Sequence, residues 1–198
     1  MTTTRTLNLR EIVVMSFISV VFGVLYLLFV FLNQVITGVL GPVGSGILAG
    51  TWIMAPIVCA LIIQKPGVAL FAELIAAGTE IMVGSVNAGS VLVLGFTQGL
   101  GAELVFAIFR YRRYTLPVLM LAGMAGTFTS FLTMYAMYGY SAYSSIVIWA
   151  MLGVMLLSGI VIAGWGSHYL THSLVRTGVL HNFALGKAQY QKRTEDSA

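Results

Sequence analysis

The sequence predicts an all-α integral membrane protein, a bundle of six transmembrane helices with both termini in the cytoplasm. Three observations predict this class. Of the 198 residues, 59% are hydrophobic and only 8% are charged, whereas a soluble domain carries about 25% charged residues. The apolar residues form long stretches separated by turn-forming residues. The ten Lys and Arg residues all fall on one side of the bundle that these stretches imply.

Each apolar stretch is a candidate helix, because about 20 residues, with about 17 as a lower limit, are needed to cross the hydrocarbon core. Lipid offers no hydrogen-bond partners to the backbone, and the stretches are too long and too apolar for barrel strands, so helices are expected. Five stretches are long enough and the second is marginal. The predicted helices cover residues 12–37, 47–63, 66–83, 91–109, 116–138 and 146–169.

The breaks between the first four stretches contain glycine and proline, which commonly interrupt helices. The first break holds Gly38, Gly41, Pro42, Gly44 and Gly46; the second is Lys65-Pro66-Gly67; the third is GSVNAGS at 84–90. The first stretch is too long for the apolar region of a cleaved signal peptide, so it is expected to remain as a span. Residues 1–198 are expected to form a single transmembrane domain, with 173–198 as a cytoplasmic tail.

The cations predict the orientation. With six helices, the three loops opposite the termini carry no charged residue, and the positive-inside rule places the cation-rich side in the cytoplasm of a bacterial-type cell membrane. The net charge of +4 therefore reflects topology and contact with lipid headgroups, and no nucleic-acid partner is expected. The cations are Arg5, Arg10, Lys65, Arg110, Arg112, Arg113, Arg176, Lys187, Lys192 and Arg193.

Three carboxylates, Glu73, Glu80 and Glu103, lie inside predicted helices that contain no Lys or Arg. A carboxylate at mid-bilayer costs about 2.5–3.5 kcal/mol, so it needs a partner or a function. Glu80 lies three positions from the outer end of its helix and is the first candidate for binding a ligand; the alternative is an interfacial residue capped by water. Glu73 lies two turns deeper on nearly the same face. Glu103 is a weaker candidate, since it could instead reach Arg110 or a backbone donor.

Aromatic and amide side chains are expected at the same outer level as Glu80. Trp52, Tyr135 and Trp149 are candidate stacking groups, although Trp and Tyr also form belts at membrane interfaces. Gln98 lies about two turns below the outer end of the fourth helix. Asn87 is a candidate ligand contact or lid residue in the third outer loop, where it could equally be a turn residue. An anion with aromatic rings and amides suits a flat ring that is cationic or donates hydrogen bonds.

Several other chemistries find little support in the sequence. No Walker A motif is present, because Gly186-Lys187-Ala188 lacks the earlier glycine and the Ser or Thr. His168 and His172 share a helix face but have no further ligands nearby in the sequence, so no metal site is expected. Asp196 is the only aspartate, which excludes a pair of catalytic aspartates. We expect neither an enzyme nor a bound cofactor.

Three segments carry a family resemblance: LREIVVMSFISVVFGVLYL at 9–27, GTWIMAPIVCALIIQKPGVALFAELIAAGTEIMVGS at 50–85, and GFTQGLGAELVFAIFRYRR at 95–113. They resemble the substrate-binding membrane subunits (S components) of energy-coupling factor (ECF) vitamin transporters, most closely the thiamin/hydroxymethylpyrimidine type. The resemblance runs from Leu9 to Tyr114 and more loosely through the sixth helix. It implies a ligand site near the outer face, closed by outer loops.

The resemblance also implies partners, namely a transmembrane coupling protein and two ATP-binding subunits. Many members dock the coupling protein through an Ala-x-x-x-Ala pattern on the first helix. The matching positions here are Ser19 and Gly23, preceded by Ser16. They are small but depart from the pattern, and we expect docking there because small residues allow helices to approach closely.

The leading hypothesis is therefore a binding subunit for thiamin or its aminopyrimidine precursor, working with an ATP-driven module. One alternative is an S component for another vitamin. Another is a stand-alone proton-coupled carrier, in which Glu73 and Glu80 would form a proton relay. An intramembrane enzyme is the least favoured, because the histidines lie away from the outer polar cluster.

Overall fold

The computed structural model describes residues 6–85, 88–176 and 183–186, and every regular element within them is helical. The expected all-α class is thus confirmed for this part of the chain. Short 3₁₀ segments (η1 to η3) and a π-helical segment (η4) interrupt or connect the α-helices. In chain order the elements are α1 (Leu9–Leu40), η1 (Pro42–Gly46), η2 (Ala49–Ile53), α2 (Met54–Ile63), α3 (Val68–Val83), α4 (Ala88–Ile108), α5 (Leu116–Met137), η3 (Tyr140–Ala142), α6 (Ser145–Ser158), η4 (Gly159–Gly166) and α7 (Ser167–Arg176).

The chain is a multi-pass membrane protein. Five helical stretches in its described part are long and apolar enough to cross a membrane: Leu9–Leu40, Pro42–Ile63, Ala88–Ile108, Leu116–Met137 and Ser145–Val175. The expectation that the second stretch is the marginal one is wrong. The short helix is α3, whose 16 residues extend about 24 Å.

The second span is longer than expected because its helical structure begins directly after Gly41. Gly41 has a φ of 71°, and Pro42 then starts η1. The segment that was predicted as a break is therefore largely helical. Gly50, further along this span, allows close packing against the end of α6, because a Cβ there would collide with the carbonyl oxygen of Ser158. Its N–H donates to Ser158 Oγ at 2.9 Å, which ties the second span to the end of α6.

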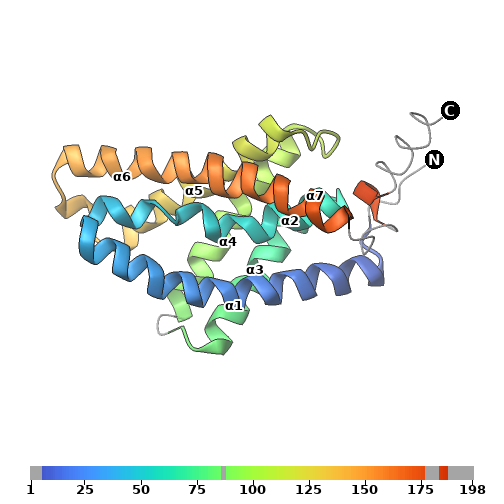
Figure 1. The fold of residues 1–198 in the computed structure, drawn as a ribbon, viewed down its shortest axis with the longest axis horizontal. Coiled ribbons are helices and arrows are strands. Elements are labelled where there is room, and N and C mark those ends of the chain that lie inside the picture. Colours follow the sequence, from blue (N-terminus) through green and yellow to red (C-terminus); the bar gives the residue numbers. More distant parts are fainter. Residues whose placement is uncertain (1–5, 86–87, 177–182, 187–198) are drawn as a thin grey trace.

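The second span forms the centre of the bundle. Every residue of α2 from Ala55 to Ile63 is buried, and both large apolar clusters of the core include α2 side chains. Figure 1 shows α1, the second span and the continuous α6–η4–α7 helix running along the long axis, with α3 and α4 passing obliquely between them. The start of α1 and the α7 segment lie at the same end of the molecule.

The start of α3 is held by Glu103 of α4. The Glu103 carboxylate accepts hydrogen bonds from the N–H groups of Gly67 (2.6 Å), Ala69 (2.9 Å) and Leu70 (3.3 Å). The first N–H groups of a helix have no partners within it, and a negative charge there is favoured by the helix dipole. Tyr111 also interacts with this carboxylate: burial, as the larger cause, and then the hydrogen bond to Glu103 raise the pKa of Tyr111 to about 12.

We expect Glu103→Ala to destabilise the protein by about 2 kcal/mol, because three backbone donors at the start of α3, one of them buried, lose their acceptor. For a chain of this size, thermal unfolding in detergent should then shift down by about 4–8 °C. Leu104→Ala is the control, since Leu104 neighbours Glu103 on α4 but is 52% exposed. Equal melting temperatures for the two variants would contradict the capping role.

Candidate functional site

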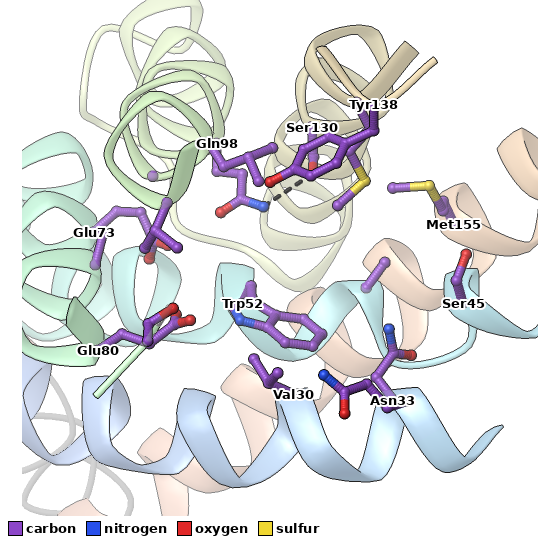
Figure 2. Close-up of a pocket in the computed structure, with 18 of the residues that line it drawn as sticks. Val30, Asn33, Ser45, Trp52, Glu73, Glu80, Gln98, Ser130, Tyr138 and Met155 are labelled. Atoms are coloured by element: carbon purple, nitrogen blue, oxygen red, sulfur yellow. Dashed lines mark hydrogen bonds between the residues drawn. The ribbon is translucent and has the colours of Figure 1, made fainter. Parts of the chain in front are cut away.

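A cavity of about 260 Å³ lies among α1, the second span and helices α3 to α6, at the end of the bundle opposite the start of α1. Figure 2 shows Glu73 and Glu80 on one side, the Trp52 ring near the centre, and Tyr138 above Gln98 and Ser130. The polar and aromatic residues that line the cavity are Asn33, Gln34, Ser45, Trp52, Glu73, Glu80, Ser85, Gln98, Ser130, Tyr138 and Tyr140. No Lys or Arg is among the described residues that line the cavity.

Tyr26 connects three elements behind this cavity. Its hydroxyl oxygen lies 2.9 Å from the Trp52 carbonyl oxygen and 3.1 Å from Glu73 Oε2, and it accepts a hydrogen bond from Ala55 N–H at 3.2 Å. Tyr26 is fully buried. The local reason is Pro56, which has no N–H to offer the carbonyl group four residues before it, that of Trp52. A side chain from α1 supplies the missing donor.

Trp52 and Glu80 form the part of the site where an aromatic ring meets a carboxylate. Glu80 is 4% exposed, and its carboxylate interacts with the side chains of Ser85 and Trp52. In Figure 2 the indole nitrogen of Trp52 is on the side that faces Glu80. The ring is thereby held at its N–H edge by Glu80, while its backbone carbonyl is held by Tyr26.

The opposite wall comes from α4 and α5. Gln98 Nε2 donates to Ser130 Oγ at 2.9 Å, and both side chains are buried. On the α1 side of the cavity, Asn33 has a buried Oδ1 without a hydrogen-bond partner among the described residues. The cavity thus combines two carboxyl groups, aromatic faces and amides, a set that can bind a small flat molecule carrying hydrogen-bond donors.

The structure brings together three of the predicted binding residues, Trp52, Glu80 and Gln98. Glu103 lies outside the cavity, and its carboxylate is occupied by the backbone donors of α3. Tyr135 and Trp149 line a separate hollow at the surface between α5 and α6, where they are 41% and 70% exposed. Asn87 lies outside the described residues.

The predicted docking residues do not form an exposed patch. Ser19 is fully buried and lies 3.9 Å from Cys59 Sγ, and Gly23 packs against Ala76 and Thr79 of α3. Ser16 is partly buried. The small residues therefore let α1 approach its neighbours within the chain, and docking of a partner through this part of α1 stays a prediction. The exposed side chains of this part of α1 are large and apolar, and Phe17 is 70% exposed.

Sequence reasoning did not single out Tyr26, Tyr138, Tyr140 or Asn33 as candidate binding residues. A tyrosine in the middle of an apolar helix, together with a proline that leaves a carbonyl unpaired in the next span, was the available signal for Tyr26. The described residues contain no group of three or more His, Cys, Asp or Glu side chains that could hold a metal ion.

Comparisons with known proteins agree with one another. Residues 10–129 match the family described as the permease component of the ABC-type cobalt transport system. The chain is 42% identical over 190 residues to a protein of Bacillus subtilis (strain 168) named "Putative HMP/thiamine permease protein YkoE", and the alignment covers 96% of each chain. A structure described as the crystal structure of an S-component of ECF transporter superposes with a TM-score of 0.94 at 43% identity, covering 97% of this chain and 98% of that one.

Proposed function

Because the chain belongs to the S components of ECF transporters, we propose that it is the high-affinity membrane subunit that binds thiamin or its hydroxymethylpyrimidine precursor for uptake. S components bind a substrate and leave ATP hydrolysis to other subunits. The observation that carries the ligand assignment is the juxtaposition of Glu80 and Trp52 in one cavity. The named relative supports the same ligand class.

The chemistry of the cavity fits both halves of thiamin. The aminopyrimidine donates hydrogen bonds, and the buried Glu80 carboxylate accepts them; a hydrogen bond to a charged group contributes about 1.5–3 kcal/mol. The thiazolium is a permanent cation, and an aromatic face such as that of Trp52 attracts it by about 2 kcal/mol in a desolvated site. Tyr138 and Tyr140 line the same cavity, while Gln98 and Asn33 offer further hydrogen bonds.

We also propose the topology of six spans with cytoplasmic termini. The start of α1 and the α7 segment share one end of the bundle, which requires an even number of crossings. Five long spans therefore need α3 as the sixth. Lys65 lies at the terminal end, where it forms an ion pair with Glu11 of α1 at 2.8 Å. The positive-inside rule assigns this end to the cytoplasm, which puts the cavity near the outer face.

The first test compares thiamin with hydroxymethylpyrimidine by calorimetry on the purified full-length chain. Thiamin should bind about 30-fold more tightly, the factor that corresponds to a cation–π contact of about 2 kcal/mol. Trp52→Leu should reduce the ratio between the affinities for thiamin and hydroxymethylpyrimidine. Trp149→Leu, which changes the separate hollow between α5 and α6, should leave this ratio unchanged. Equal affinities of the wild-type chain for both ligands would contradict an aromatic contact with the cation.

The second test uses the three tryptophans, Trp52, Trp149 and Trp165, as reporters. Thiamin should change the fluorescence of the wild-type chain, and Trp52→Phe should abolish most of that change because only Trp52 lines the cavity. Trp149→Phe and Trp165→Phe should retain it, since both rings are on the surface, 70% and 52% exposed. Loss of the signal in Trp149→Phe alone would move the site to the hollow between α5 and α6.

The third test separates a subunit from an autonomous carrier. Proteoliposomes that hold this chain alone should bind thiamin without accumulating it. Addition of a transmembrane coupling protein and two ATP-binding subunits should give uptake that depends on ATP, and a variant with an inactive ATP site provides the control. Uptake by the chain alone in response to a pH gradient would favour the proton-coupled carrier instead.

A further inference from the structure

The Tyr26 hydroxyl has more acceptors around it than it has hydrogens. A tyrosine hydroxyl carries one hydrogen and can accept through its lone pairs. Ala55 N–H already donates to it, and the two other neighbours, the Trp52 carbonyl oxygen at 2.9 Å and Glu73 Oε2 at 3.1 Å, are both oxygen atoms. One hydrogen cannot serve both of these oxygens.

The Trp52 carbonyl oxygen is the better acceptor for the Tyr26 hydrogen. It is the nearer of the two oxygens. In a regular helix it would accept a hydrogen bond from the N–H four residues later, but that residue is Pro56, which has no N–H. With the Tyr26 hydrogen directed at Trp52, a carboxylate at Glu73 would place its lone pairs against those of the tyrosine oxygen in a fully buried position. A carboxylic acid at Glu73 resolves the conflict, because its own hydrogen is donated to Tyr26.

Among the described residues, no Lys or Arg faces Glu73. The titratable groups that face it are Tyr26 from α1, Cys59 from α2 and Glu80 from its own helix. From α4 it meets the glycines Gly95 and Gly99. Glu73 and Glu80 are seven residues apart, about 10 Å along α3, and they line the same cavity.

We propose that Glu73 is a neutral carboxylic acid that donates its hydrogen to Tyr26, so that Glu80 is the only anion in the cavity. This inference rests on the proposed function for its ligand, and it defines the charge of that ligand. A cavity with one negative charge matches a ligand with one positive charge, such as thiamin. Glu73 then contributes shape and hydrogen bonding, and Glu80 contributes the charge.

Two matched substitutions on one helix test the assignment. Glu73→Gln replaces the acid with a neutral amide of similar shape that can still donate to Tyr26, so thiamin affinity should fall by much less in this full-length variant than in Glu80→Gln. Glu80→Gln removes the only charge and should weaken binding by about tenfold or more. Both are measured by calorimetry in detergent at neutral pH.

The outcomes distinguish this inference from the proposed function. An equally large loss in Glu73→Gln would show that Glu73 is also an anion, which overturns the inference while thiamin binding by the wild type still stands. Unchanged affinity in Glu80→Gln would overturn the assignment of the single charge to Glu80. Absence of thiamin binding to the folded wild-type chain would instead overturn the proposed function.

Infrared spectroscopy tests the protonation directly and requires no ligand. At neutral pH the wild-type chain should show the C=O stretch of a protonated carboxylic acid, shifted in D₂O. The band should disappear in Glu73→Gln and persist in Glu80→Gln. Absence of the band from the wild type overturns the inference even if neither variant can be purified in a folded form.

Discussion

A carboxyl group inside a membrane-spanning bundle must find its partners within the protein or in a ligand, since a charged one at mid-bilayer costs about 2.5–3.5 kcal/mol. This chain keeps three such groups on two adjacent helices. Glu103 is satisfied by the backbone donors at the start of α3, and Glu73 by the Tyr26 hydroxyl. Glu80 interacts with the side chains of Ser85 and Trp52. Of the three groups, Glu73 and Glu80 line the cavity, where a ligand can supply a further partner, while Glu103 lies outside it.

The sequence predicted the helices well because the length and apolar character of a span are local properties. It also predicted that Glu80 and Trp52 would lie at the outer level of the bundle, with Gln98 about two turns below the outer end of its helix. It could not predict which face of each helix turns inward. In a soluble protein the polar face identifies the outside, but lipid is as apolar as the core, so that periodic signal is weak. Tyr135 and Trp149 were therefore expected in the site, although they are exposed at the surface.

The sequence also could not predict which residues form hydrogen bonds with the buried polar groups. Glu103 bonds to Gly67, 36 positions away in the chain, and Tyr26 bonds to Glu73 across 47 positions. Such pairs depend on how α1, α3 and α4 are placed against one another. The same limit applied to Ser19 and Gly23: their small size correctly indicated close helix contact, but the contact is with α3 and Cys59 of the same chain.

Helix α3 carries both cavity acids, and two contacts fix its position. The Glu103 carboxylate holds the first N–H groups of α3, which sets its height along the bundle. The bond between Tyr26 and Glu73 sets its rotation, because it directs one side chain of the helix towards α1. Both contacts constrain the same helix, on which Glu80 lies two turns beyond Glu73 on nearly the same face. A short helix held in this way presents its last carboxylate, Glu80, to the cavity through contacts that other residues make.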